Sequence, residues 1–244
     1  MGEERRELVV FDGDDTLWRT QEIYDEIKSA FVDRIRGWNL PSEEALATLD
    51  RIDADAASVR GFTIDRFVDS MVRTYRLLSE QAHETPNTAS ENDVRSLAAP
   101  LLGDYQLYPD ALDTIRRLRP YFELVLATKG ERKLQERKVH RLGLGKLFSH
   151  VYFVDQKTEV EYVRILSQHR LPADMAWAVG NSLRSDINPA ISLGMPAIWI
   201  RRRGWIYEQA SPIAMNVPIV DSLSEAADLL IAHRNVEARI GIDS

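Results

Sequence analysis

The hydrophobic run Leu8–Phe11 ends in a cluster of three carboxylates, Asp12, Asp14 and Asp15, with Gly13 between the first two. Because strand side chains alternate, an Asp-x-Asp at a strand end places both carboxylates on one face. Gly13 lets the following turn bring backbone N–H groups close to a ligand. Asp is also common in surface turns and helix caps, but such a turn needs no buried strand before it. The crowded negative charge requires a cation, and hard oxygen donors of this kind suit Mg²⁺.

Length, charge and composition narrow the class of protein. A chain of 244 residues fits one large domain, or a core domain with a smaller insert. The net charge of −7 argues against a general nucleic-acid binder, and no apolar stretch is long enough to cross a bilayer. The lack of cysteine excludes disulfides and thiolate metal sites, and the charged start Met1–Glu7 has no apolar signal-peptide core. We therefore expect a cytoplasmic protein without nucleic-acid or membrane partners, and the sequence favours no particular oligomeric state.

The hydrophobic pattern changes its period along the chain. Between Trp18 and Leu107, apolar residues recur at helical spacing and no segment is typical of a strand; Thr20, Ser42 and Ser90 are expected at or near helix starts. From Tyr108 onward, helices alternate with short apolar runs, as in βαβ units. The sequence thus predicts an α/β fold, a doubly wound, Rossmann-like and mostly parallel sheet built from residues 1–17 and 108–244. An all-helical cap domain, residues 18–107, is inserted after the first strand.

Within the core, expected helices and strands alternate as far as residue 200, and one further strand and helix close the pattern. The strands are expected at 123–128, 151–154, 175–179, 196–200 and 218–220, and the helices at 110–118, 132–142, 159–168, 186–193 and 222–233. In such sheets, ligands bind beyond the carboxyl ends of the strands. Polar residues stand at these positions: Thr128, Lys129, Lys157, Asn181 and Asp186. Singly, each has an ordinary structural explanation as a helix cap, a solvated lysine or a surface ion pair. Together at successive strand ends, they could hold a metal and a phosphate.

At this point the chain resembles the haloacid dehalogenase superfamily. Its first motif, Asp-x-Asp-x-Thr/Val after a hydrophobic strand, is matched by Asp12–Thr16, and its second, a hydrophobic strand ending in Ser or Thr, by Thr128. The third motif, a Lys after the next strand, is matched by Lys157. The fourth, usually Gly-Asp with another acid several positions on, reads Gly-Asn-Ser-Leu-Arg-Ser-Asp at 180–186, so Asn181 replaces the first acid. The resemblance covers nearly the whole chain.

The resemblance implies a role for each matching residue. Asp12 would attack phosphorus to form an aspartyl-phosphate, and Asp14 would act as acid and then base. Mg²⁺ would be held by Asp12, Asp186 and the backbone carbonyl of Asp14, with Asn181 as a secondary ligand. Phosphate oxygens would be bound by Thr128 and Lys157, helped by backbone N–H groups at Gly13 and Lys129.

Asp14 also favours one reaction within the superfamily. Dehalogenases resemble this scaffold but lack the second acid, because a halide leaving group needs no proton, whereas an alkoxide does. We therefore expect a phosphoric monoester hydrolase acting on a small phosphorylated metabolite, of the sugar phosphate or nucleotide monophosphate class. A phosphoglucomutase-like phosphoryl transferase remains the main alternative. A dehalogenase, a receiver-like phosphate-binding module and a degenerate scaffold are weaker ones. Gly61, Phe62 and Arg66 are candidate cap contacts, and the run from Arg201 to Trp205 is a candidate rim for an anionic substrate.

Overall fold

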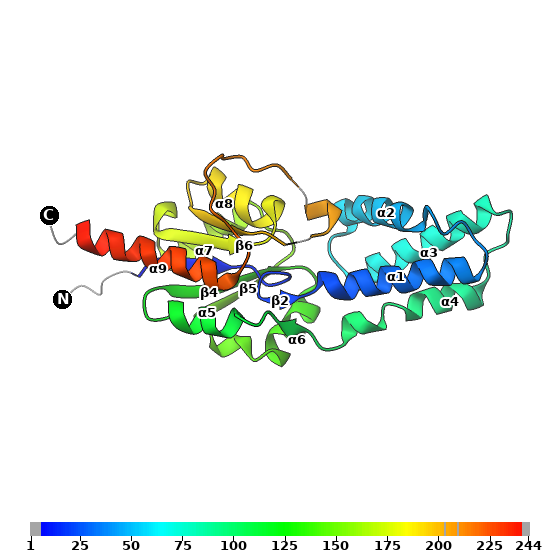
Figure 1. Ribbon diagram of the computed structural model, residues 1–244, viewed down its shortest axis with the longest axis horizontal. Coiled ribbons are helices and arrows are strands. Elements are labelled where there is room, and N and C mark those ends of the chain that lie inside the picture. Colours follow the sequence, from blue (N-terminus) through cyan, green and yellow to red (C-terminus); the bar gives the residue numbers. More distant parts are fainter. Residues whose placement is uncertain (1–5, 203, 209, 241–244) are drawn as a thin grey trace.

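The chain folds into two lobes that lie end to end. The computed structural model describes residues 6–202, 204–208 and 210–240, without the side chains of Ile206 and of 237–240. Two segments named in the sequence analysis therefore lie outside the described residues: the start Met1–Arg5 and, within the candidate rim, Arg203. One lobe contains a sheet with helices on both faces, and the other contains helices α1 to α4 (Figure 1). The described part of the chain begins and ends at the end of the sheet lobe that faces away from the helical lobe (Figure 1).

The sheet lobe confirms the predicted doubly wound α/β fold. Its six strands have the order β5-β4-β1-β6-β7-β8, and every neighbouring pair is parallel. The strand order reverses at β1, which pairs with β4 on one side and β6 on the other, and such a reversal point is where open α/β sheets bind ligands. The strands are β1 Leu8–Phe11, β4 Glu123–Lys129, β5 His150–Val154, β6 Ala176–Gly180, β7 Ala197–Ile200 and β8 Ile219–Val220.

Alternation along β1 divides the core into two layers. Val9 and Phe11 pack with residues of α5, α6 and α9 on one face of the sheet, whereas Leu8 and Val10 pack with residues of α7 and α8 on the other. All four β1 residues are buried, as expected for a central parallel strand covered on both faces. The helices are α5 Ala111–Leu118, α6 Arg132–Arg141, α7 Glu159–His169, α8 Asn188–Ser192 and α9 Leu223–Ile240.

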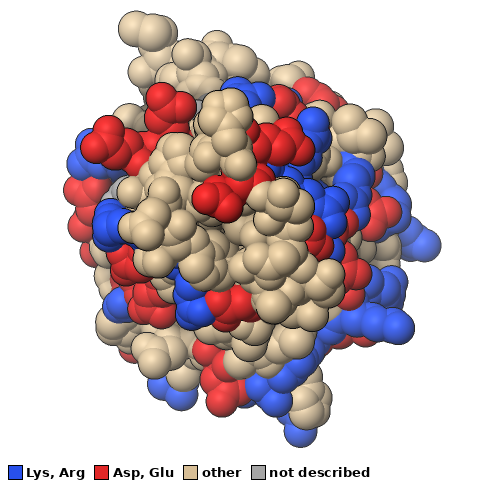
Figure 2. Space-filling model, turned by 90° about the vertical axis from the view of Figure 1, so that its right-hand side faces the viewer, with Lys and Arg blue, Asp and Glu red and all other residues tan. Residues whose placement is uncertain are grey.

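The helical lobe has an apolar core of its own. Its helices are α1 Gln21–Gly37, α2 Ala45–Arg60, α3 Ile64–Gln81 and α4 Thr88–Ser96. Phe31, Phe67 and Leu78 are fully buried members of this core. Helix α3 begins after Thr63, whose side chain accepts a hydrogen bond from the backbone N–H of Arg66, a typical N-cap. Figure 2 faces the end of this lobe and shows acidic and basic side chains both distributed around it.

Several predicted helix starts are corrected by the structure. Helix α2 begins at Ala45 rather than beside Ser42, and Ser90 lies inside α4, where Asn87 is the capping residue. Thr20 does occupy the N-cap position of α1, but its hydroxyl donates to Asp14 instead of capping the helix. Polar side chains near a helix start can serve several partners, so the sequence pattern alone did not separate these cases.

The expectation that 18–107 contains no strand was wrong. Strands β2 Trp18–Arg19 and β3 Gln106–Leu107 pair in an antiparallel ribbon, which joins the entry and exit of the helical lobe. Two-residue strands are too short to show an alternating pattern. The helix expected at 186–193 is instead a π-helical turn, Leu183–Ile187, followed by α8. No helix in the described part of the chain combines the length and apolarity needed to span a bilayer.

Candidate active site

A cavity lies between the carboxyl edge of the sheet and the helical lobe. Its volume is about 140 Å³. The sheet lobe lines it with Asp12, Asp14, Lys129, Lys157, Asp186 and other residues, and the helical lobe lines it with Gln21, Tyr24, Lys28, Asp53, Phe62 and Ile64 among others. The cavity therefore coincides with the strand-order reversal at β1, and it is closed from the opposite side by the helices.

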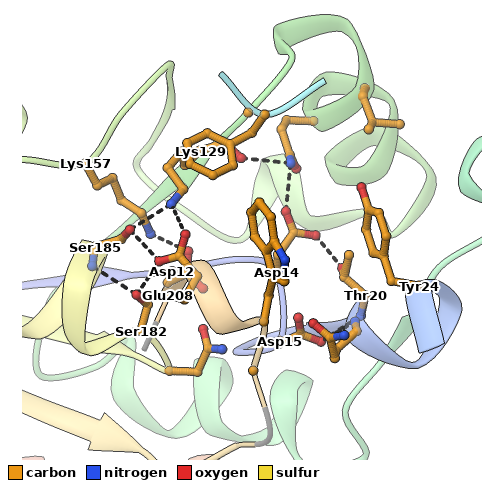
Figure 3. A pocket seen from close by; sticks show the side chains of 18 of the residues that line it. Asp12, Asp14, Asp15, Thr20, Tyr24, Lys129, Lys157, Ser182, Ser185 and Glu208 are labelled. Carbon is orange, nitrogen blue, oxygen red and sulfur yellow. Dashed lines mark hydrogen bonds and ion pairs between the residues drawn. The ribbon is translucent and has the colours of Figure 1, made fainter. Parts of the chain in front are cut away.

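Asp12, Lys157 and Asp186 form a buried triad at the centre of the site. Asp12 follows β1, Lys157 follows β5, and Asp186 lies in the π-helical turn after β6. The Lys157 ammonium contacts Asp12 Oδ1 and lies 2.5 Å from Asp186 Oδ1 (Figure 3 shows Lys157 beside Asp12). The backbone N–H of Ser182 donates to Asp186 Oδ2 at 2.9 Å, which fixes the second oxygen. Three of the sequence-predicted site residues are thus brought into direct contact.

The triad carries more negative than positive charge, because two buried carboxylates share one ammonium. Burial and repulsion from Asp186 raise the pKa of Asp12 to about 7, although Lys157 opposes that rise. Burial acts to lower the pKa of Lys157, but the two carboxylates outweigh it and hold the ammonium protonated. A cation placed beside Asp12 and Asp186 would relieve the repulsion between them.

The donor set of the triad fits a hard divalent cation. Asp12 and Asp186 offer carboxylate oxygens of the kind that Mg²⁺ prefers, and Mg²⁺ often takes only one or two carboxylates. Among the described residues, no group of three or more His, Cys, Asp or Glu side chains is arranged to hold a metal. The Asn181 side chain lines the cavity, and its Oδ1 accepts a hydrogen bond from Thr16 at 3.3 Å. The metal assignment therefore rests on Asp12 and Asp186 and remains a proposal.

Asp14 is held in a separate set of contacts. Its Oδ1 accepts hydrogen bonds from Trp18 Nε1 at 2.7 Å, from Lys138 Nζ at 2.6 Å and from the Thr20 hydroxyl, and its Oδ2 accepts from Gln135 Nε2 at 2.7 Å. Figure 3 shows Thr20 directed at Asp14. Burial alone would raise the pKa of Asp14, but the Lys138 ammonium and these hydrogen bonds lower it below the usual value. The free protein therefore favours the carboxylate form of Asp14, so a proton must reach Asp14 before it can act as an acid.

Asp15 supports the fold of the loop. Its Oδ1 accepts hydrogen bonds from the backbone N–H groups of Thr20 and Gln21, each at 2.8 Å. Asp15 thus provides an acceptor for backbone donors at the start of α1 that have no partner within the helix. Burial raises the pKa of Asp15 to about 6. Asp15 adopts a positive φ of 59°, a left-handed conformation that Asp tolerates better than most residues.

The predicted phosphate ligands differ in whether they line the cavity. Thr128 is fully buried, and its hydroxyl donates to Gln135 Oε1 at 3.2 Å; neither Thr128 nor Gly13 belongs to the described residues that line the cavity. Gly13 lies so close to the Trp18 ring that an added Cβ would lie 2.2 Å from Trp18 Cη2. Lys129 does line the cavity, where its ammonium donates to Ser185 at 2.7 Å and contacts Glu208.

Glu208 is a site residue that sequence analysis missed. It follows β7 and reaches back so that its carboxylate accepts hydrogen bonds from Lys129, Ser182 and Ser185 (Figure 3). Burial acts to raise the pKa of Glu208, but Lys129 outweighs burial and lowers it. No local pattern marks Glu208, the last residue of the short 3₁₀ helix Ile206–Glu208, as a site residue.

Gln135 and Lys138 were missed as well, although a signal for them existed. They stand three positions apart on α6, so they share one helix face, and both are buried despite being polar. A buried polar pair on the helix after Thr128 points to a function at the adjacent strand end.

The helical lobe and the segment after β7 close the cavity together. Phe62 packs edge-on against Trp205 and Tyr207, with ring centroids 6.0 and 5.2 Å apart. Arg66 lines the cavity, but it is buried in an ion pair with Asp53 rather than solvated, whereas Gly61 is not among the lining residues.

Only part of the candidate rim reaches the cavity. Gly204 and Trp205 line it. Arg201 pairs with the Asp221 carboxylate, and Arg202 donates to the Asp221 backbone carbonyl at 2.8 Å. Neither arginine is a lining residue, so the prediction that these two attract substrate at the rim is not supported by their position.

Comparison with known proteins identifies the family. No curated protein matches the chain. A haloacid dehalogenase-like family hydrolase from Xanthomonas campestris shares 24% identity and a TM-score of 0.76, with 100% of this chain and 97% of that chain covered. The HAD-hydrolase YfnB from Bacillus subtilis bound to magnesium shares 21% identity and a TM-score of 0.63, covering 93% and 99%. L-2-haloacid dehalogenase from Xanthobacter autotrophicus shares 15% identity and a TM-score of 0.62, covering 92% and 98%. These likenesses show a common fold. The family model of haloacid dehalogenase-like hydrolases matches residues 7–194, so the chain belongs to that family.

Proposed function

We propose that the protein is a Mg²⁺-dependent phosphatase that hydrolyses a small phosphorylated metabolite through an aspartyl-phosphate. The observation that carries the proposal is the Asp14 carboxylate, which lines the same cavity as Asp12 and comes two residues later in the chain. A halide leaves without a proton, so a dehalogenase has no use for a second acid here. A leaving alkoxide needs a proton, and Asp14 is the group that supplies it.

The two half-reactions assign complementary tasks to the two aspartates. In the first, Asp14 has taken up the proton of a monoprotonated phosphate group; an Asp12 oxygen forms a bond to phosphorus, the bond from phosphorus to the leaving oxygen breaks, and that oxygen takes the proton from Asp14. In the second, Asp14 accepts a proton from water and the water oxygen attacks phosphorus. The bond from phosphorus to the Asp12 oxygen breaks, which releases phosphate and the free Asp12 carboxylate. Among the described residues, Asp14 Oδ2 accepts from Gln135 alone, so Oδ2 has room for the transferred proton.

Mg²⁺ bound by Asp12, Asp186 and the backbone carbonyl of Asp14, with Asn181 nearby, would supply positive charge that reduces repulsion between the nucleophile and the phosphate. Lys157 supports the same step, because it holds the Asp12 oxygen in place and favours its ionised form. Lys129 and Thr128 remain proposed phosphate ligands. Thr128 would have to release Gln135 to donate to a phosphate oxygen.

The size of the cavity supports a small substrate. The cavity has a volume of about 140 Å³ and is lined by side chains from both lobes, which favours a small substrate over a large one. We propose that the helical lobe acts as a cap, with the β2–β3 ribbon as its base, and excludes water and large partners from the reaction. A sugar phosphate or nucleotide monophosphate fits these limits, and a folded phosphoprotein does not.

The test compares two reactions in one preparation. We expect phosphate release from an aryl phosphate that requires Mg²⁺ and stops on chelation, and no halide release from a 2-haloacid. Asp12→Asn should abolish phosphate release while the far-UV circular dichroism spectrum is unchanged. Halide release without phosphatase activity would contradict the proposal and favour a dehalogenase. Transfer of the phosphoryl group to a sugar hydroxyl in place of water would favour the phosphoglucomutase-like alternative.

A further inference from the structure

We propose that the cavity selects a phosphate monoester whose leaving group is uncharged. This inference rests on the proposed phosphatase function and narrows its substrate class. The observation behind it is that every cationic side chain that lines the cavity, among the described residues, already contacts an acidic residue of the protein. A carboxylate or a second phosphate on the leaving group would therefore find no available counter-charge.

Two of these cationic side chains form ion pairs with the proposed catalytic and metal-binding carboxylates. Lys157 lies between Asp12 and Asp186, and Lys138 contacts Asp14 at 2.6 Å. Both lysine side chains are only 3% exposed. Neither could turn toward a leaving group without releasing an aspartate that the reaction needs.

The third cation, Lys129, is neutralised by Glu208. The Ser182 hydroxyl donates to Glu208 Oε2, and the Ser185 hydroxyl donates to the same oxygen at 2.7 Å. The Glu208 carboxylate therefore occupies the set of donors that a substrate carboxylate would otherwise bind. Lys129 Nζ also lies 4.0 Å from the centre of the Phe62 ring, which places this set of donors where the sheet lobe meets the helical lobe.

The two cations of the helical lobe are paired in the same way. Lys28 Nζ lies 2.6 Å from Asp50 Oδ1, and Arg66 Nη1 lies 2.5 Å from Asp53 Oδ1. The leaving group extends toward this lobe, because the phosphoryl group must face Asp12 at the sheet edge. An anionic leaving group would have to displace an internal carboxylate or lie unpaired beside it, and either outcome is costly in a buried site.

The charges of the cavity lining also favour an uncharged leaving group. The lining side chains carry no surplus of basic residues that could bind an additional anion, because six are acidic and five are basic: Asp12, Asp14, Asp15, Asp53, Asp186 and Glu208 against Lys28, Arg66, Lys129, Lys138 and Lys157. Tyr24, Phe62 and Trp205 add aromatic surface to the same walls. Hydroxyl groups and rings suit such walls better than a second anionic group does.

The test uses substrates that differ in one group. Glycerol 3-phosphate and 3-phosphoglycerate have the same carbon chain, but one carries a hydroxymethyl group where the other carries a carboxylate. We expect kcat/KM to be at least tenfold higher for glycerol 3-phosphate. Where turnover of both is slow, the same ratio is measured as competitive inhibition of aryl phosphate hydrolysis. Equal values, or a preference for 3-phosphoglycerate, would overturn the inference while leaving the phosphatase proposal standing. An absence of phosphate release from every monoester would overturn both.

Two variants test the charge pairing directly. Glu208→Gln removes the charge opposite Lys129, and Asp50→Asn removes the charge opposite Lys28; the Asp50 side chain is 28% exposed, so its loss should be tolerated by the fold. Each variant should bind 3-phosphoglycerate more tightly. The ratio of kcat/KM for glycerol 3-phosphate to kcat/KM for 3-phosphoglycerate should therefore fall at least fivefold. Glu84→Gln is the matched control, since Glu84 is exposed and lies outside the cavity lining. If both variants kept the ratio of the Glu84→Gln protein, charge pairing would not set selectivity.

Discussion

Lys138 Nζ lies 2.6 Å from Asp14 Oδ1, although 124 positions separate the two residues in the chain. Lys138 comes from α6, outside all four segments that resemble family motifs, and its side chain is buried. Its ammonium also lies 4.4 Å from the centre of the Tyr105 ring. The charge state of the proposed acid and base is thus controlled from a helix, and the loop that carries Asp14 supplies only part of its environment.

Lys138→Met should lower kcat and move the optimum to higher pH. Without the ammonium, the pKa of Asp14 rises, because burial acts to raise it and Lys138 is the largest of the interactions that oppose burial. A higher pKa keeps Asp14 protonated, and able to donate to the leaving oxygen, at higher pH. The carboxylate also loses a positioning contact but is itself retained, so we expect kcat to fall by roughly 10- to 100-fold, less than the full contribution of about 10²- to 10⁴-fold from a general acid or base. The pH profile of kcat measures both effects.

Lys133→Met is the control for that variant. Lys133 lies on the same helix and is exposed, so its replacement should leave the kcat profile unchanged. Lys138→Arg keeps the charge and should restore part of the activity. A Lys138→Met protein with normal melting behaviour and the wild-type pH profile would show that Lys138 does not control Asp14.

The same substitution at two neighbouring aspartates should change stability in opposite directions. The folded pKa of Asp12, about 7, exceeds its ordinary value of 3.8, so the folded state binds this proton more tightly than the unfolded chain does. Its stabilising contribution is complete below about pH 4 and is lost as the pH rises through 7. At pH 8 without Mg²⁺, Asp12→Asn should therefore stabilise the protein by ~2 kcal/mol, a Tm rise of roughly 5 °C.

Asp14→Asn should do the reverse. The pKa of Asp14 is lowered in the folded protein, so its carboxylate stabilises the fold above its unfolded pKa and the effect is lost as the pH falls through the folded value. Its replacement leaves Lys138 buried without a carboxylate, which should cost about 2 kcal/mol at pH 8. Thermal melting at pH 8 and pH 5 in chelator compares the two variants. A loss of stability in both, of equal size, would contradict the charge assignment of the site.

The class of the sheet was predictable because its signals are local. The buried run Leu8–Phe11 and the alternating helices and strands after Tyr108 have strong hydrophobic periods, and they fix the α/β class. The β2–β3 ribbon was not predictable in the same way, since two residues per strand give no period. The π-helical turn that carries Asp186 also lacks a sequence signature of its own.

The predicted site residues that follow strands lie together in the structure, whereas residues that reach the same edge from elsewhere were not predicted. Asp12, Lys157 and Asp186 meet because parallel strands end at one edge. Glu208 reaches the same edge from a short 3₁₀ helix after β7, and its contacts depend on tertiary packing that no short pattern encodes. Thr128 stands at the predicted strand end, yet its hydroxyl is turned to Gln135, because a buried hydroxyl requires a partner.

Mg²⁺ affinity should rise with pH. Asp12 must lose its proton to bind a cation, and with a pKa of about 7 it is mostly protonated at pH 6 and mostly ionised at pH 8. The dissociation constant should therefore fall by roughly tenfold between these pH values, with close to one proton released per ion at pH 6. Isothermal titration calorimetry in buffers of different ionisation enthalpy measures both quantities. Asp12→Asn should remove the pH dependence, and a wild-type affinity that is constant over this range would contradict the assignment of Asp12 as a ligand.

Gly180→Ala should weaken Mg²⁺ binding without replacing any ligand. A Cβ at Gly180, the last residue of β6, would lie 2.3 Å from Asp186 Oδ2 and 2.4 Å from its Cγ, so the carboxylate would have to move. Moving it would break the hydrogen bond that Ser182 N–H donates at 2.9 Å. We expect at least a tenfold loss of Mg²⁺ affinity, measured by calorimetry at pH 8. Gly37→Ala is the matched control, because a Cβ there would meet no atom within 4 Å. If the Gly180→Ala protein folded and bound Mg²⁺ as the Gly37→Ala protein does, Asp186 would not be the ligand.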